Sequence, residues 1–202
     1  LLITNKCISQ NGDIDKWLKD LNRDDNQQVF AAAETADSIG RFDTVQIKKI
    51  VQQLEQATAK SGLRLQARVQ GLKARLLFYK LDASDSLYAT VMRDALEKAY
   101  RLNDIYMVAE FSRWYGEMLN TIDDPAGAAL YCMNSVKLQE EAGLQYFPSV
   151  KTFYLTTAEM LARTRNYRES IDYYNLALKL KDSTTDKNFI ANSMNTLGKS
   201  YH

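Results

Sequence analysis

The chain has few of the side chains on which most catalytic sites are built. His202 is the single histidine among its 202 residues. With one histidine, the sequence offers neither a Ser-His-Asp or Cys-His catalytic arrangement nor a zinc site made of several histidines. The glycine-containing stretches SIGR and PAGAA lack the spacing of phosphate-binding and dinucleotide-binding loops. The sequence therefore predicts no metal ion and no cofactor.

Neighbouring carboxylates are the remaining candidates for acid–base chemistry. Asp123-Asp124 and Glu140-Glu141 could in principle exchange a proton with a substrate. Each pair stands at an expected helix boundary, where helix capping and solvation explain acidic residues better. The stretches RDD and DASD lack the alternating ligands and the closing glutamate of a calcium loop. An enzyme with a carboxylate-based active site is therefore the third-ranked hypothesis, below a binding module and a structural scaffold.

Basic and aromatic residues mix in KARLLFYK and LARTRNYR, as they do on RNA-binding surfaces. Their aromatic residues, however, fall on the side of the helix that we expect to be buried. The 26 Lys and Arg residues nearly balance the 25 Asp and Glu residues. Because so small a net charge creates no strong field, we expect neither nucleic acid nor an anionic membrane surface as a partner.

The first residues, LLITNKCISQ, have two interpretations. An apolar run followed by small and polar residues is typical of the end of a secretory signal peptide, which predicts a periplasmic or exported protein. Alternatively, residues 1–12 are an ordinary N-terminal segment and the protein is cytoplasmic. No stretch of the sequence is long and apolar enough to predict a membrane span. Cys7 and Cys132 form no metal-binding spacing, and we expect no disulfide between them.

The sequence predicts helices throughout and no strands. Two prolines and eight glycines are few turn-forming residues for this length. Asp43 is a candidate N-cap, Pro125 stands where a helix tolerates proline, and Gly143 follows a helix end. The expected helices cover residues 13–22, 29–40, 43–61, 63–81, 84–102, 104–120, 125–142, 148–164, 166–182 and 187–202.

The helix expected at 166–182 carries apolar residues on two adjacent faces. One stripe contains Tyr167, Ile171, Tyr174 and Leu178, and the other contains Ser170, Tyr173, Ala177 and Leu180. A helix on the surface of a single core usually shows one stripe of limited width. Two stripes predict that neighbouring helices pack against this helix on both sides.

The sequence also repeats itself. Pairs of a small and an apolar residue recur at Ala95-Leu96, Ser135-Val136 and Ala177-Leu178, which are 40 and 42 residues apart. The helices that precede them keep the same phase, with small residues at Gly116, Ala158 and Gly198. Regular self-similarity of this length predicts a stack of similar helix pairs.

In these positions the chain resembles the tetratricopeptide repeats, a family whose unit is two antiparallel helices. LGKSY at 197–201 matches the leucine, glycine and tyrosine of the first helix. YRESIDYYNLAL at 167–178 matches the second helix, with Ser170 and Ala177 at its small positions and Tyr174 at its aromatic position. The period of 40 to 42 residues departs from the usual unit of roughly 34, which makes this a long-period variant.

The resemblance implies an all-α fold, a right-handed solenoid of antiparallel helix pairs. It is good from Asp104 onward, fair from Leu63 and poor before. Because the last helix lacks a second helix, we expect that the natural protein continues, or that a partner or a second copy covers this end. The expected divisions are a signal remnant or disordered N-terminus at 1–12, degenerate helices or a cap at 13–62, repeats at 63–103, 104–146 and 147–186, and an incomplete repeat at 187–202.

The resemblance further implies that the first helices of the pairs line a concave groove for a partner. The carboxylate clamp of chaperone-binding members is not expected, because Leu77 stands one turn after Lys73 where that clamp needs asparagine. The groove residues implied by the phase are Gln70, Lys73, Leu77, Lys80, Glu110, Arg113, Glu117, Asn120, Thr152, Leu155, Glu159, Arg163, Asn192, Asn195 and Lys199.

The leading functional hypothesis is a module that binds a protein or peptide segment. The long period resembles that of the periplasmic sensor segments of membrane-bound signalling regulators in Gram-negative bacteria, which implies a sensor role in signal transduction. The alternative is a structural scaffold that forms homo-oligomers through the terminal helix at 187–202.

Overall fold

The computed structural model describes residues 44–78, 87–144 and 150–180, together with Lys19, Asn195 and Gly198. Within these residues the chain forms seven α-helices and no strand. The helices predicted near both ends of the chain, the candidate cap Asp43 and the N-terminal segment lie outside the described residues, apart from these three single positions. The all-helical fold class predicted from the sequence is confirmed for the described part of the chain.

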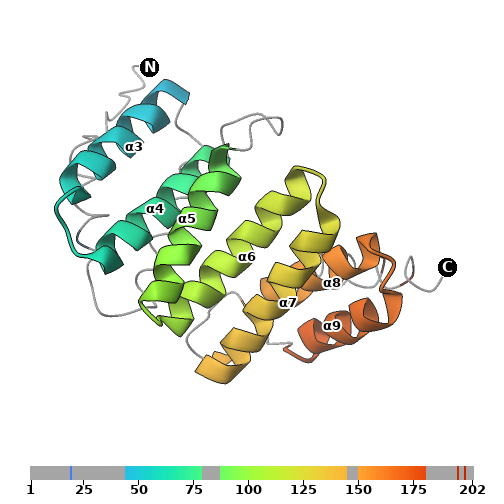
Figure 1. The fold of residues 1–202 in the computed structure, drawn as a ribbon. Coiled ribbons are helices and arrows are strands. Elements are labelled where there is room, and N and C mark those ends of the chain that lie inside the picture. The colour runs from blue at the N-terminus through green and yellow to red at the C-terminus, as the bar shows by residue number, and fades with distance from the viewer. Residues whose placement is uncertain are drawn as a thin grey trace, which may run out of the picture. The chain divides into compact units, whose positions relative to one another are not determined.

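The chain divides into two compact units, at residues 1–102 and 103–202. The first unit contains α3 (Thr44–Thr58), α4 (Leu63–Phe78) and α5 (Leu87–Arg101). Helix α4 packs against both α3 and α5 (Figure 1). The buried core includes Leu54 from α3, Leu72 and Leu76 from α4, and Met92 and Ala95 from α5.

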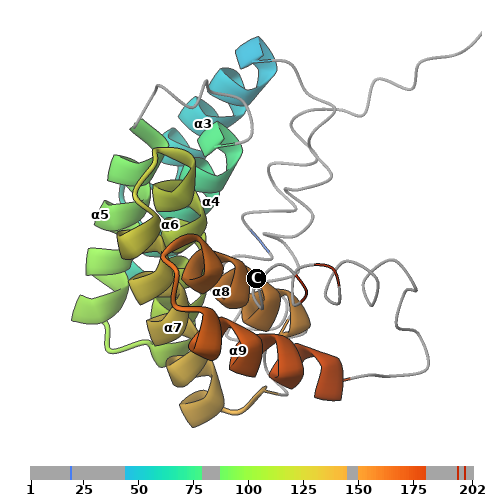
Figure 2. The same cartoon turned by 90° about the vertical axis from the view of Figure 1, so that its right-hand side faces the viewer.

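The second unit contains α6 (Ile105–Thr121), α7 (Pro125–Ala142), α8 (Val150–Arg163) and α9 (Tyr167–Lys179). Each helix packs against the next in the chain, and α6 also contacts α8. Figures 1 and 2 show α6 with α7 and α8 with α9 as two hairpins. The predicted boundaries agree with these helices to within a few residues.

The ends of α7 carry the signals that the sequence shows there, and α6 begins with an aspartate cap that the sequence analysis did not identify. The side chains of Asp104 and Asp124 accept hydrogen bonds from backbone N–H groups in the first turns of α6 and α7. Pro125 is in the first turn of α7, where its missing N–H costs no helical hydrogen bond. Gly143 ends α7 with a φ of 105°, a conformation that glycine adopts without steric strain.

The two hairpins of the second unit have the same turn, 42 residues apart. The N–H of Asp124 donates to the carbonyl of Leu119, and the N–H of Asn166 donates to that of Leu161, both at 2.9 Å. The residue before each donor is in the left-handed region, with φ of 64° at Asp123 and 62° at Arg165. The repeat found in the sequence therefore has a counterpart in the backbone hydrogen bonds of these turns.

Small residues make the helices of each hairpin approach closely. Gly116 is buried and faces Cys132 and the carbonyl of Ala128. At the matching position of the next hairpin, the hydroxyl of Ser170 donates to the carbonyl of Ala158 at 2.8 Å. The third small residue of this series, Gly198, is exposed, and a methyl group added to it would meet no described atom within 4 Å beyond its chain neighbours and its own helix.

The buried residues of helix α9 lie along the line where its two predicted stripes meet. Ser170, Tyr174 and Ala177 are buried, and they come from both stripes. Ile171 and Tyr173 are half-buried, and the remaining stripe positions in the described chain range from half-buried to exposed. One central line along α9 thus carries most of the packing against α8.

Candidate partner-binding site

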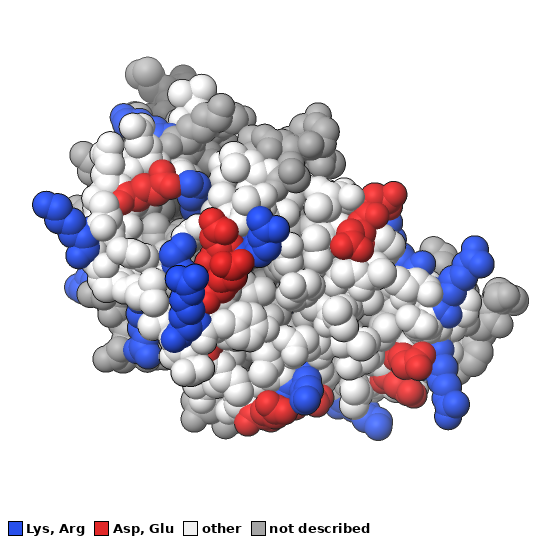
Figure 3. All heavy atoms as spheres, in the orientation of Figure 1, with Lys and Arg blue, Asp and Glu red and all other residues white. Residues whose placement is uncertain are grey.

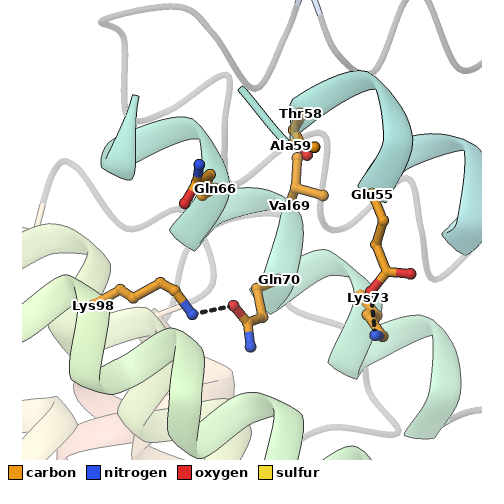
Figure 4. Close-up of a pocket in the computed structure, with 8 residues that line it drawn as sticks. All are labelled: Glu55, Thr58, Ala59, Gln66, Val69, Gln70, Lys73 and Lys98. Atoms are coloured by element: carbon orange, nitrogen blue, oxygen red, sulfur yellow. Dashed lines mark hydrogen bonds and ion pairs between the residues drawn. The ribbon is translucent and has the colours of Figure 1, made fainter. Parts of the chain in front are cut away.

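A pocket of about 270 Å³ lies beside α4 in the first unit. It is lined by polar residues of α4, by the C-terminal end of α3 and by one lysine of α5 (Figure 4). The lining residues are Glu55, Thr58, Ala59, Gln66, Val69, Gln70, Lys73 and Lys98.

Helical spacing explains why α4 faces this pocket with polar groups. Gln66, Gln70 and Lys73 are four and three residues apart, so their side chains lie along one face of the helix. The residues on the other faces of α4 are largely buried in the core. Val69 adds an apolar surface to the pocket wall.

Gln70 is the centre of a hydrogen-bonded group at the mouth of the pocket. Its amide oxygen accepts a hydrogen bond from the Lys98 ammonium, and its amide nitrogen donates to Oδ2 of Asp94 at 3.4 Å. One turn along α4, the ammonium of Lys73 pairs with the carboxylate of Glu55. Figure 4 shows Gln70 between Lys98 and Lys73.

The other polar groups of the pocket are held by backbone contacts. The hydroxyl of Thr58 donates to the carbonyl of Leu54 at 2.8 Å, and Nε2 of Gln66 donates to the carbonyl of Ser61 at 2.8 Å. These contacts fix the pocket wall at the junction of α3 and α4.

The four groove positions predicted in this unit have different environments. Gln70 and Lys73 line the pocket. Leu77 is buried in the core of the unit with 6% of its surface exposed, so its side chain is not available to a partner in this structure. Lys80 lies outside the described residues.

In the second unit, three predicted groove residues form a buried charged cluster on α6. The guanidinium of Arg113 donates to Glu110 at 2.6 Å and to Glu117 at 2.7 Å. The side chains of Arg113 and Glu110 are 7% and 5% exposed. The guanidinium also stacks on the ring of Phe153 from α8, with 4.4 Å between its Cζ atom and the ring centroid. Arg113 therefore links α6 to α8 through its contact with Phe153.

The electrostatics of this cluster keep Arg113 charged. Burial by itself lowers the pKa of an arginine, because a cation loses its hydration. The carboxylates of Glu110 and Glu117 outweigh that effect and raise the pKa of Arg113 above its ordinary value. The cluster is thus an internal charge network and presents little of its charge to solvent.

Two other predicted residues come together where α6 and α8 end. Nη1 of Arg163 donates to the amide oxygen of Asn120, and its Nη2 lies 3.9 Å from the carboxylate of Asp123. Glu159 lies one turn earlier on the exposed side of α8, where partial desolvation raises the pKa of its carboxyl group.

The remaining predicted positions are less informative. Thr152 is exposed and Leu155 is half-buried on α8, and Asn195 is exposed. Asn192 and Lys199 lie outside the described residues. Of the predicted set, the structure brings together Gln70 with Lys73, Glu110 with Arg113 and Glu117, and Asn120 with Arg163.

The surface charges of the two units differ in the view of Figure 3. Acidic and basic side chains gather over α4 and α5, whereas the surface over α6 and α7 carries few charged side chains. The polar pocket of the first unit lies beside α4, one of the two helices over which these charged side chains gather.

Six of the eight lining residues lie outside the predicted groove set, and two of these six, Glu55 and Lys98, are charged. They lie on α3 and α5, while the groove prediction considered only the first helices of the pairs. The spacing of Gln66, Gln70 and Lys73 was the available signal for a polar face on α4. That spacing does not show that Lys73 pairs with Glu55, 18 residues away, or that Gln70 contacts Lys98, 28 residues away.

Comparison with known proteins provides no identity for the chain. No family model matches the sequence, and no curated protein matches it. No group of three or more His, Cys, Asp or Glu side chains that could hold a metal occurs among the described residues. None of the helices in the described ranges has the length and apolar character needed to cross a membrane.

Proposed function

We propose that the chain is a protein-interaction module, in which stacked helix pairs form a right-handed solenoid and hold a polypeptide segment on their first helices. The observation that carries this proposal is the pocket beside α4, because Gln70 and Lys73 on the expected binding face line it. A bound polypeptide needs partners for its backbone amides as well as pockets for its side chains. The pocket offers amide, ammonium and carboxylate groups next to an apolar wall.

The matching turns of the second unit support the solenoid part of the proposal. Identical hydrogen bonds at Asp124 and Asn166 give the two hairpins the same connection. Repeated hairpins that bury a face against their neighbours are the structural unit of solenoids.

A peptide array tests the proposed function. The full chain is applied to immobilised peptides of varied sequence, and retention is compared for the unaltered protein, Gln70→Ala and Lys137→Ala. We expect a subset of peptides to be retained, and retention to fall with Gln70→Ala. Lys137 is exposed on α7, far from the pocket in sequence and in the other unit, so its replacement should leave retention unchanged.

The proposal fails if no peptide is retained above background, or if the two variants reduce retention equally. In the second case, binding would depend on a general property of the surface and not on the pocket.

A further inference from the structure

The pocket beside α4 contains a cation, the Lys98 ammonium, that forms no ion pair with a carboxylate of the described residues. The lining includes two ammonium groups, of Lys73 and Lys98, and one carboxylate, of Glu55. Glu55 pairs with Lys73. Lys98 instead contacts the neutral amide oxygen of Gln70, and no described carboxylate lies within ion-pair distance of its ammonium.

The direction of the Lys98 side chain also indicates that its ammonium is not paired with the acidic residue one turn before it on its own helix. Asp94 stands one turn before Lys98 on α5, at the i,i+4 spacing that commonly forms an ion pair on a helix. That pair is not formed. Lys98 is half-buried and extends to α4, while Asp94 accepts a hydrogen bond from the other end of the Gln70 amide.

A partly desolvated ammonium is stabilised most strongly by an anionic acceptor. Each lysine has three N–H donors, of which one is used in the contacts described here. Both lysines therefore keep donors for a ligand that enters beside Gln70.

The size and walls of the pocket limit the ligand further. A volume of about 270 Å³ is below the roughly 300–1,000 Å³ of typical sites for drug-sized molecules. Val69 and Ala59 supply apolar surface beside the two ammonium groups. This combination suits a carboxylate on a short aliphatic stem, such as a glutamate side chain.

We propose that the pocket between α3, α4 and α5 binds a carboxylate on a short aliphatic stem, supplied by an acidic side chain of the bound polypeptide. Lys98 is the principal donor, Lys73 is the second donor, and Val69 with Ala59 contacts the stem. This inference rests on the proposed peptide-binding function and names the chemistry that its pocket selects.

The test compares blocked peptides by NMR titration of the full chain. One short peptide has a central glutamate flanked by alanines, and its counterpart has glutamine. Acetylated and amidated ends remove the terminal charges. An alanine peptide with a free C-terminal carboxylate and free glutarate serve as two further probes, which separate a side-chain carboxylate from the other sources of the same group.

We expect the glutamate peptide to bind roughly tenfold more tightly than the glutamine peptide, as a charge-assisted contact at a half-buried site provides. Lys98→Gln should remove most of this preference. Glu55→Gln should increase it, because the change releases Lys73 and removes a like charge. Lys137→Gln alters the net charge as Lys98→Gln does, and should leave the preference unchanged.

The outcomes separate this inference from the proposed function. Equal binding of the glutamate and glutamine peptides would overturn the carboxylate site and leave peptide binding intact. Equal losses with Lys98→Gln and Lys137→Gln would overturn it as well, as would tighter binding by the peptide whose only carboxylate is its C-terminus. If glutarate binds through Lys98 but no peptide does, the anion site stands and the peptide-binding function fails.

Discussion

Gly116 of α6 and Cys132 of α7 approach so closely that a methyl group on Gly116 would lie 2.6 Å from the Cys132 sulfur. The same methyl group would lie 3.0 Å from the backbone carbonyl oxygen of Ala128. Helices can cross at this distance only when one of them has no side chain at the crossing point. The glycine therefore sets the spacing of the first hairpin in the second unit.

Replacing Gly116 with alanine should lower the free energy of unfolding by about 1–3 kcal/mol, because the added methyl group forces the hairpin apart. Urea unfolding measures the change. The control is Gly62→Ala, since nothing lies within 4 Å of the methyl group that it would add. In a double-mutant cycle, Cys132→Ala should relieve part of this loss. The rest should remain, because the added methyl group still lies too close to the backbone carbonyl of Ala128. A stable Gly116→Ala protein would show that the helices are not in close contact here.

Arg113→Ala should lower the free energy of unfolding by about 3–5 kcal/mol, because it leaves two shielded carboxylates without their guanidinium. The matched control is Arg163→Ala. That side chain is 47% exposed and its contacts are near solvent, so the loss should stay below about 1 kcal/mol. Chemical denaturation of both variants measures the difference. Equal losses would mean that burial does not distinguish these two arginines.

Cys132 should make the unfolding free energy fall as the solution becomes alkaline. Burial, then the charge of Glu117, raises the pKa of its thiol from 9.0 to about 12, although Arg113 acts in the opposite direction. Below pH 9 the thiol is protonated in both the folded and the unfolded state, so its contribution to the free energy of unfolding is fully present. Between pH 9 and 12 the unfolded chain releases the proton that the folded chain retains, so stability is lost at up to about 1.4 kcal/mol per pH unit.

The measurement is urea unfolding at several pH values from 8 to 10, with the slope compared between the unaltered protein and Cys132→Ala. The variant should show the smaller decline. Tyr154 and Tyr173 also have raised pKa values, but their ordinary value of 10.0 places their main contribution above this window. In a Cys7→Ser background, the native thiol should also react with a disulfide reagent far more slowly than the unfolded one. Identical pH slopes would contradict a buried thiol.

Asp124→Ala should lower the free energy of unfolding by about 1 kcal/mol, because its carboxylate caps the N–H of Gly127 at 2.9 Å. Asn166 occupies the same place in the second turn, but its side chain makes no capping bond to α9 and donates to Thr164 at 3.0 Å. Asn166→Ala should therefore have the smaller effect. Thermal unfolding of the two variants tests this order, and a larger loss at Asn166 would reverse it.

Local features of this sequence predicted the helices well. Apolar spacing defined their faces, and the signals at Asp124, Pro125 and Gly143 located the ends of α7. These effects act within a few residues, so the sequence displays them directly. The small residues at Gly116 and Ala158 also marked helix contacts: a methyl group on Gly116 would clash with Cys132, and the carbonyl of the buried Ala158 accepts a hydrogen bond from Ser170.

The candidate site was predicted only in part. Helical phase assigned Arg113 to the predicted groove, but phase does not report how deeply a side chain is buried, and Arg113 is buried. Its burial depends on Phe153, which is 40 residues away. The same reason applies to Lys98, whose contact with Gln70 joins separate helices. Long-range contacts of this kind are set by packing, and spacing along one helix does not encode them.

The matching turns at Asp123-Asp124 and Arg165-Asn166 make residues 124–165 an exchangeable cassette. A copy inserted after Arg165 would create two junctions, one from α8 into the copied α7 and one from the copied α8 into α9, and both could use the same backbone geometry. Lengthening this protein by gene duplication therefore requires no new connecting loop.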